Sequence, residues 1–379
     1  IKEYLEILSS RERIMGIISD ELREVKDNFA VPRRTEIIEW SGDMMDEDLI
    51  EREEMVVTVT AGGYIKRTAL ADFRAQKRGG KGLQGMSTKD EDVVTTLFVA
   101  NTHTQLLFFT TDGMAYKLKT WRLPLGGRTA KGKAVVNILP IPTGVSIAAI
   151  MPVDAPEAEW ENLQIIFATS AGDVRRNALS DFTNVRANGK IAMDLPENVE
   201  LVNARIANED DDVMLVTNSG RAIRFSTTDV RVFKGRKSTG VRGIRLSGED
   251  RVVSMSIIRH FVATSDERAA YLKMRRAVAG MTDDEEITDE DDSNAHATIS
   301  PARYAEMSAE ENLILTISAG GSGKLSSSHD YPVRGRGGMG VAAMDKAMRG
   351  GDLVASFPVD IEDQIMLATS KGQSIRVPV

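Results

Sequence analysis

The chain has 379 residues, of which 42% are hydrophobic and 27% charged, and its formal net charge is −8. It contains no cysteine, which excludes a disulfide framework, Cys-ligated metal sites and thiol catalysis, and its four histidines are too far apart in sequence to suggest a metal site. No apolar run reaches the ~18 residues of a membrane span and no signal peptide opens the chain, so we expect a protein of the reducing cytoplasm with about two domains.

The charge is unevenly distributed along the sequence. Residues 281–311 contain eleven acidic residues and one basic residue, a net charge of −10, so the remainder of the chain carries +2. Because one segment accounts for the negative total, the net charge does not argue against a nucleic-acid partner.

Residues 1–30 are predicted to form one helix. Its apolar residues recur at alternating three- and four-residue steps, with Arg11 as the one break. A narrow seam of this kind indicates a coiled coil with a partner helix, although an ordinary amphipathic surface helix is the alternative. The chain begins at Ile1 without a capping residue, as expected of a piece of a longer protein. Pro32 ends the helix, and the acidic residues that follow predict a linker over 31–54.

From residue 55 onward, short β-branched runs alternate with glycine turns, and a basic residue stands four positions after each turn glycine. The turn glycines are spaced 51, 59, 48, 100 and 52 residues apart: Gly62, Gly113, Gly172, Gly220, Gly320 and Gly372. The basic residues are Lys66, Lys117, Arg176, Arg224, Lys324 and Arg376. A period near 50 built from hairpins predicts an all-β, propeller-like domain over 55–379, with one blade per repeat and six blades.

Two features interrupt this period. The interval of 100 residues contains an acidic insertion at about 259–311, with a helical stretch at about 265–278 and a run at 283–292 that is too charged to pack. The sixth repeat stops at Val379, seven residues after its glycine, so we expect a truncated sixth blade.

Loops that mix glycine with lysine or arginine follow the first five turns. Glycine lets the backbone approach a surface closely, and the cations neutralise phosphates without reading base sequence. The candidate DNA-binding residues are Arg74, Gln76, Lys77, Arg78, Gly79, Gly80, Lys81 and Gly82 in the first loop, Arg128, Lys131 and Lys133 in the second, Arg186 and Lys190 in the third, Lys234, Arg236, Lys237 and Arg242 in the fourth, and Arg334 and Arg336 in the fifth.

Recurring blade by blade, such loops would line a rim, and a duplex that follows the rim must bend. Bending 20–30 bp by 40–90° costs on the order of 1–6 kcal/mol, which many cationic contacts would offset. The alternative interpretation is that these loops are flexible, solvated connections. For the six basic residues after the turns, the alternative is an outer strand that faces water and blocks edge pairing with its charges.

Signals of catalysis are weak. The segment Gly320–Lys324 resembles part of a P-loop, but Ser318 and Leu325 stand where the motif needs glycine and serine or threonine, so a hairpin turn is predicted instead. No nucleophilic triad or carboxylate pair stands out, and we expect neither a catalytic centre nor a metal site in this chain.

Residues 76–82, Gln-Lys-Arg-Gly-Gly-Lys-Gly, resemble the gyrase-A box, the heptapeptide that distinguishes the C-terminal DNA-wrapping domains of the bacterial DNA gyrase A subunits. Segments 48–59, 99–103 and 136–140 are also similar to that family, and the resemblance covers 31–379 apart from the insertion. Residues 1–30 are similar to the end of the coiled-coil arm in the breakage–reunion core of the same proteins.

The resemblance implies a six-bladed β-pinwheel whose outer edge binds and wraps duplex DNA with a positive crossing. In this family, DNA gyrase, an ATP-hydrolysing topoisomerase, turns that crossing into negative supercoils, and the box is needed for wrapping. The implied partners are double-stranded DNA, the rest of the gyrase A subunit in its homodimer, and the gyrase B subunit in a heterotetramer, associated with the nucleoid. The catalytic tyrosine and the ATP and Mg²⁺ sites belong to parts outside this chain, so no cofactor is expected here.

Three other interpretations stay open. The C-terminal domain of the topoisomerase IV A subunit has similar blades but a lost or degraded box. A propeller used as a protein-interaction scaffold would carry apolar or aromatic loop tips, and we expect these to be missing because the loops carry glycine, lysine and arginine. An enzyme that binds nucleotide phosphates would need a complete P-loop. The insertion departs from the family pattern, and we hypothesise that it mimics DNA and restrains binding on the rim.

Overall fold

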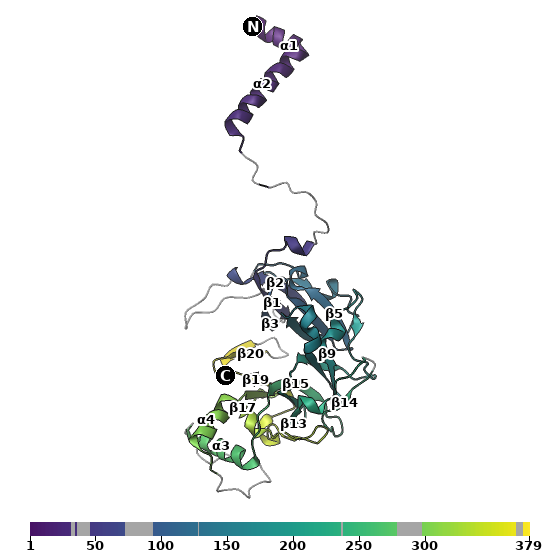
Figure 1. The fold of residues 1–379 in the computed structure, drawn as a ribbon, viewed down its shortest axis with the longest axis vertical. Coiled ribbons are helices and arrows are strands. Elements are labelled where there is room, and N and C mark those ends of the chain that lie inside the picture. The colour runs from purple at the N-terminus through teal and green to yellow at the C-terminus, as the bar shows by residue number, and fades with distance from the viewer. Residues whose placement is uncertain are drawn as a thin grey trace. The chain divides into compact units, whose positions relative to one another are not determined.

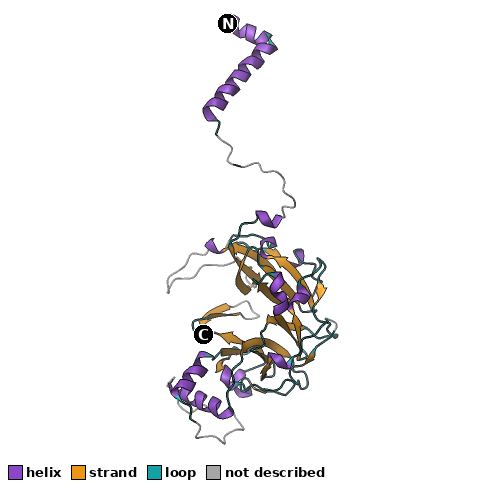
Figure 2. Cartoon of the chain, in the orientation of Figure 1, coloured by secondary structure: helices purple, strands orange, loops and turns teal. Residues whose placement is uncertain are grey.

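The computed structural model describes residues 1–31, 35, 46–72, 94–127, 129–235, 238–278, 298–368 and 374–379 (Figure 1). It divides into two compact units, Ile1–Leu49 and Ile50–Val379. The first unit is helical and the second consists mainly of strands (Figure 2). Among the described helices, none combines the length and the apolar character needed to cross a membrane.

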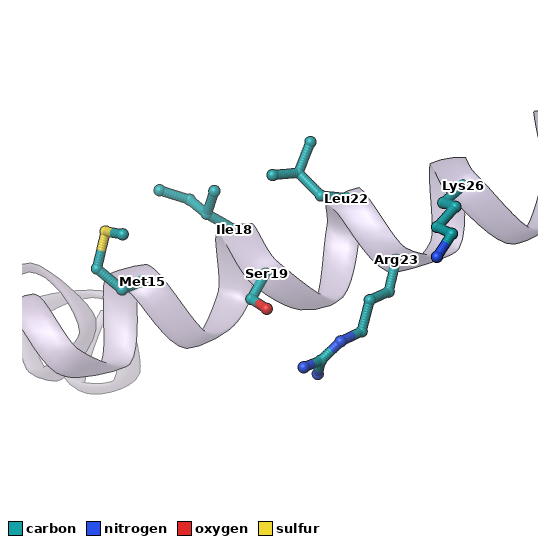
Figure 3. A pocket seen from close by; sticks show the side chains of 6 residues that line it. All are labelled: Met15, Ile18, Ser19, Leu22, Arg23 and Lys26. Carbon is teal, nitrogen blue, oxygen red and sulfur yellow. The ribbon is translucent and has the colours of Figure 1, made fainter. Parts of the chain in front are cut away.

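The first unit contains α1 (Lys2–Ser9), α2 (Arg11–Phe29) and the 3-10 turn η1 (Asp46–Leu49). The prediction of one continuous helix over 1–30 is wrong, because Ser10 is extended and its Oγ accepts a hydrogen bond from the Arg13 N–H at 3.3 Å. Serine is a preferred N-cap, so it starts α2 anew. Met15, Ile18 and Leu22 point to one side of α2, where they border a shallow, exposed hollow (Figure 3).

The second unit consists of antiparallel sheets, here called blades 1 to 6 in chain order. Blade 1 has the order β3 (Val94–Asn101), β1 (Glu54–Thr60), β2 (Tyr64–Ala69), β6 (Lys133–Ala134). Blade 2 has the order β7 (Ile147–Val153), β4 (Gln105–Thr110), β5 (Met114–Lys119), β10 (Lys190–Ile191). Blade 3 has the order β11 (Leu201–Ile206), β8 (Gln164–Thr169), β9 (Asp173–Ala178), β14 (Val241–Arg242). Blade 4 has the order β15 (Val252–Arg259), β12 (Asp211–Thr217), β13 (Arg221–Ser226), β18 (Val341–Ala342).

Blades 5 and 6 contain fewer described strands. Blade 5 has the order β19 (Leu353–Val359), β16 (Leu313–Ser318), β17 (Gly323–Ser327), and blade 6 is the hairpin of β20 (Gln364–Ala368) and β21 (Ser374–Pro378). All six repeats therefore form the expected hairpin, and the propeller-like fold is confirmed.

The fourth strand of blades 1 to 4 comes from the following repeat. β6 pairs with β2 although it follows β5 in the chain, and β10, β14 and β18 pair in the same way with β5, β9 and β13. The expectation of one blade per repeat is confirmed, with the addition that repeats 2 to 5 each give their last strand to the blade before them. This exchange interlocks neighbouring blades.

The hairpin turns of blades 1 to 5 each depend on a glycine in the left-handed region. In blades 1 to 5 the glycine N–H donates to the carbonyl of a threonine or serine three residues earlier, at 2.9–3.1 Å. These glycines have φ between 76° and 90°, which side chains rarely adopt: Gly63, Gly113, Gly172, Gly220 and Gly321. The assignment of Gly62 and Gly320 as turn glycines is therefore wrong by one residue. The predicted hairpin turn at the P-loop-like segment is confirmed.

The hydrophobic core lies between blades rather than within them. A buried apolar cluster joins each pair of successive blades, and in chain order the second cluster holds Phe109, Phe167 and Phe182 with ring centroids 5.3–5.8 Å apart. Because strand residues alternate between two faces, blades 2 to 5 each pack both faces against neighbouring blades. In blades 1 to 4, the exchanged strand forms the outer edge of the sheet.

The acidic insertion contains two described helices, α3 (Ser265–Val278) and α4 (Pro301–Ala309). The helical stretch at about 265–278 is confirmed, whereas α4 was not predicted; Ser300 caps it by accepting from the Arg303 N–H. Tyr271 of α3 packs edge-on against the ring of His329 in the 3-10 turn η8 (Ser328–Asp330), with ring centroids 4.9 Å apart. The charged run at 283–292 lies outside the described residues.

Candidate nucleic-acid interface

Four segments, here called straps, carry the chain from the hairpin of one blade onto the outer edge of the preceding blade. They begin at the C-cap residues of η3 (Thr120–Arg122), η6 (Leu179–Phe182), η7 (Thr227–Asp229) and η8 and end in the exchanged strands. The straps are residues 123–134, 183–191, 230–242 and 331–342. They place the predicted glycine- and cation-rich loops on the outer edges of blades 1 to 4.

Glycine is required where each strap turns back into its short strand. Gly132, Gly189, Gly240 and Gly340 have φ between 72° and 93° and each directly precedes an exchanged strand. A Cβ on Gly132 would lie 2.5 Å from the Ile65 carbonyl oxygen, and one on Gly240 would overlap the carbonyl oxygen of Val174. The glycines thus allow the strap backbone to lie directly against the sheet edge.

The straps differ sharply in charge from the chain as a whole. Together they contain twelve lysines and arginines and no aspartate or glutamate, in a chain with net charge −8. With no acidic residue among these cations in the straps, their fields add along the sheet edges.

The straps on blades 1 and 2 hold four described residues of the predicted site. Lys133 and Arg186 are exposed. The Lys131 ammonium lies 3.7 Å from the centroid of the Tyr64 ring, and Lys190 Nζ donates to the Asp181 carbonyl at 2.6 Å. Lys133 and Arg186 are therefore free to reach solvent, whereas Lys190 also ties its strap to η6.

The straps on blades 3 and 4 hold the other four described residues of the predicted site. Lys234, Arg242 and Arg334 are exposed. Arg336 is also exposed, but its Nε donates to the Asp229 carbonyl at 3.0 Å and its Nη1 to the Arg242 carbonyl at 3.2 Å. Arg336 thus joins two neighbouring straps as well as adding charge.

The remaining predicted site residues lie outside the described residues. They are Arg74, Gln76, Lys77, Arg78, Gly79, Gly80, Lys81, Gly82, Arg128, Arg236 and Lys237.

Basic residues that follow the hairpin turns have a different role from the one predicted. Arg67, Lys117, Arg176 and Arg224, each four residues after its left-handed glycine, donate to carbonyl oxygens at the 3-10 turn of the next blade. The acceptors are Leu123, Thr183, Thr227 and Ser328. We call these contacts latches, because each fastens a blade to the start of the strap that covers it.

Both interpretations of the basic residues after the turns, contact with DNA and exposure on an outer strand, are wrong for Lys66, Arg176 and Arg224. These three residues are buried, because the straps cover the edge of the strand that carries each of them. Burial lowers the pKa of Arg176 and of Arg224, yet arginine stays charged at neutral pH because its ordinary pKa is so high. In blade 5 the equivalent residue is Leu325, and Lys324 beside it is exposed. The side chain of Arg376 lies outside the described residues.

The sequence analysis missed two exposed cations at the straps. Arg231 stacks over Phe233 with its guanidinium 4.4 Å from the ring centroid, and Arg245 follows the strap on blade 3. The close spacing of Arg231 and Phe233 was a usable signal, since residues two apart on an extended chain lie on the same face and can stack.

The straps also expose apolar side chains, contrary to the expectation that apolar loop tips are missing. Leu125 is 67% exposed and Met339 is 51% exposed. They lie on the same straps as the cations.

Comparison with known proteins gives one family. A family model described as the DNA gyrase C-terminal domain, beta-propeller, matches residues 54–101, 104–154, 164–208, 211–259, 312–357 and 363–379, which are the six repeats. The chain is 46% identical to the DNA gyrase A subunit of Granulibacter bethesdensis over 100% of this chain and 42% of that protein. It is 38% identical to the DNA gyrase A subunit of Haemophilus influenzae over 100% of this chain and 40% of that protein. The chain therefore spans about two fifths of the length of these curated relatives.

Solved structures share the fold. The C-terminal domain of a DNA topoisomerase IV is similar with a TM-score of 0.61 at 21% identity, covering 87% of this chain and 84% of that one. A DNA gyrase A C-terminal domain is similar with a TM-score of 0.56 at 20% identity, covering 86% of this chain and 89% of that one. At these identities the likeness concerns the fold alone.

Proposed function

The chain belongs to the family of DNA gyrase C-terminal β-propeller domains, and we propose that its straps bind duplex DNA and wrap it around the outer edges of the blades. The wrapped duplex carries a positive crossing. Within a whole gyrase, built from two A subunits and two B subunits, ATP-driven strand passage converts that crossing into negative supercoils. ATP and Mg²⁺ act elsewhere in that assembly, and this chain contributes the DNA path in the cytoplasmic nucleoid.

The observation that carries this proposal is the charge of the straps. The strap sequences contain twelve cations and no acid, and the nine cations that the structure describes lie along four sheet edges. Sequence-independent DNA binding needs many phosphate contacts and no base-reading groups. The glycine-rich backbone supports the same contacts, since it leaves the strap close to the sheet and its N–H groups near the surface.

The energetics favour a path that runs over several straps. Bending 20–30 bp by 40–90° costs on the order of 1–6 kcal/mol, and the contacts of one strap would hardly offset it. If about six phosphates are neutralised across the straps, the logarithm of the affinity falls by about 5 for a tenfold rise in salt. A protein-interaction scaffold would show no such dependence.

The first repeat fits the same scheme. Its basic segment, which includes 76–82, follows the 3-10 turn η2 (Leu70–Asp72), just as the four straps follow η3, η6, η7 and η8. We assign residues 76–82 the role that the gyrase-A box has in the family, that of an element needed for wrapping.

The experiment is duplex binding by the whole 379-residue chain at several salt concentrations. The test variant replaces four strap cations with glutamine: Lys131, Lys133, Arg186 and Lys234. The control variant makes the same charge change on the helices of the first unit: Lys2, Arg11, Arg23 and Lys26. Lys190 and Arg336 are left intact because their side chains also bond to the protein.

The salt slope of the strap variant should be shallower than wild type by about 3 to 4, close to 0.9 for each cation removed. The control variant should keep the wild-type slope. Equal slopes for the strap variant and the wild type, or equal losses in both variants, would contradict a DNA path over the straps.

A further inference from the structure

An aliphatic residue occupies the same place on each described strap. It stands two residues after the C-cap of the 3-10 turn: Leu125, Val185, Val232 and Val333. Leu125, Val232 and Val333 are 67%, 39% and 38% exposed, whereas Val185 packs against the apolar cluster between blades 2 and 3. Three of four straps therefore present an aliphatic side chain to solvent at an equivalent position.

The backbone fixes this position on the sheet edge. Leu125, Val232 and Val333 form parallel bridges with the latch residues Arg67, Arg176 and Arg224. The residue that follows each aliphatic residue donates its backbone N–H to the carbonyl of the same latch residue. For example, the Phe233 N–H donates to the Arg176 carbonyl at 2.7 Å. The aliphatic side chains are thus held on the edge by the backbone contacts that align the latches, and they are not loop tips that happen to be apolar.

Stability of the fold gains little from an aliphatic residue at Leu125, which is 67% exposed and therefore buries little area. Val232 and Val333 bury more of their surface, and each still presents over a third of it to solvent. The surroundings also restrict the partner, because cations such as Lys234 and Arg334 follow within two residues and the straps contain no acid. A fitting partner is therefore a polyanion that offers apolar surface between its charges.

We propose that Leu125, Val232 and Val333 contact the deoxyribose faces of the bound duplex, between the phosphates held by the strap cations. This inference rests on the proposed function and adds an apolar, salt-independent contribution to it. Deoxyribose carbons lie between successive phosphates on every nucleotide, so the contact needs no particular base sequence.

The three residues act as contacts and not as wedges. Apolar side chains that insert between base pairs open the minor groove and bend the duplex toward the major groove. A duplex wrapped on a convex edge must instead compress the groove that faces the protein, so insertion would oppose the wrap. Two of the three side chains are valines, which are also short for insertion.

The test is a triple variant of the whole chain, Leu125→Ala with Val232→Ala and Val333→Ala. Its affinity for duplex DNA at fixed salt should fall by about 10-fold, because part of three aliphatic contacts is lost. Its salt slope should equal that of the wild type, because no counterion release is removed. The matched control replaces three exposed apolar residues that lie away from the straps with alanine: Val262, Val354 and Ile361.

A second variant, Val232→Lys, locates the position relative to the phosphates. If Val232 faces the duplex backbone, the added ammonium should steepen the salt slope by about 0.9. An unchanged slope, or a triple alanine variant that binds like the wild type or like the control variant, would overturn the inference. If the wild type binds duplex DNA with a steep salt slope in the same experiment, the proposed function stands even when this inference fails. If the wild type and every variant show a flat salt slope, both the proposed function and this inference are wrong.

Discussion

Replacing Arg224 with methionine should lower the free energy of unfolding of the second unit by about 3–5 kcal/mol, the cost of leaving one buried charge without its partner. The Arg224 side chain is 3% exposed and its Nε donates to Asp212 Oδ2 at 2.7 Å. Its Nη1 donates to the Ser328 carbonyl at 2.8 Å and its Nη2 to the Arg259 carbonyl at 2.9 Å. Methionine keeps most of the volume but removes the guanidinium from the fully buried Asp212, which keeps His260 Nδ1 at 2.7 Å from its Oδ1. It also removes the side-chain donor from the carbonyls of Ser328 and Arg259.

Urea unfolding followed by circular dichroism measures this change. Arg221→Met is the matched control, because Arg221 is exposed on the same strand and its loss should stay within about 0.5 kcal/mol. Adding Asp212→Asn to Arg224→Met should restore part of the loss, since it removes a buried carboxylate that has lost its guanidinium partner. A loss below about 1 kcal/mol for Arg224→Met, or a double variant less stable than the single one, would refute the role of the buried Arg224–Asp212 ion pair, which lies within blade 4 and holds the guanidinium that forms the latch to blade 5.

Two further predictions follow from backbone geometry and from burial. Gly240→Ala should destabilise the strap on blade 3 by about 2 kcal/mol or more, measured by urea unfolding, because φ is +93° and the new Cβ meets a carbonyl oxygen. Burial lowers the pKa of His329, helped by the nearby charge of Arg224 and opposed by the Met307 carbonyl and by Glu311 and Asp330. The unfolded chain takes up this proton near pH ~6.5 while the folded chain resists it, so stability is full above that pH and falls below it.

Controls for both predictions are available in the chain. Gly235→Ala lies in the same strap with open space around it and should change stability by less than about 0.5 kcal/mol; an equal effect at both glycines would contradict the steric reasoning. For His329, thermal unfolding at about pH 7.5 and about pH 5.5 should show a larger loss for the wild type than for His329→Gln. The same pH dependence of stability in the wild type and in His329→Gln would contradict the role of His329.

The repeat period and the basic loops could be predicted because both are local properties of the sequence. The exchanged strands could not, because Lys190 and Ile191 pair with Ala115 and Met114 across about 75 residues of chain and two residues carry almost no strand signal. For the same reason the basic residues after the turns were expected to be accessible, either to DNA or to water, since nothing local shows that a strap covers them.

Other differences had a signal that the sequence analysis did not use. In the hairpin turns of blades 1 to 5, the left-handed glycine follows a threonine or serine by three residues, as Gly63 follows Thr60, which separates Gly63 from the adjacent Gly62. The Ser300-Pro301 pair is typical of a helix start, with serine as the N-cap and proline as the first helical residue, and it predicts α4. Ser10 likewise could have marked the break between α1 and α2.

The central claim is that the blades wrap DNA with a positive crossing, and religation of a nicked plasmid in the presence of the chain tests it most directly. The wild type should shift the topoisomers toward positive linking, and a variant with Lys77→Ala, Arg78→Ala and Lys81→Ala should not. A wild type that binds the plasmid and leaves the topoisomers where they fall without protein would contradict the claim.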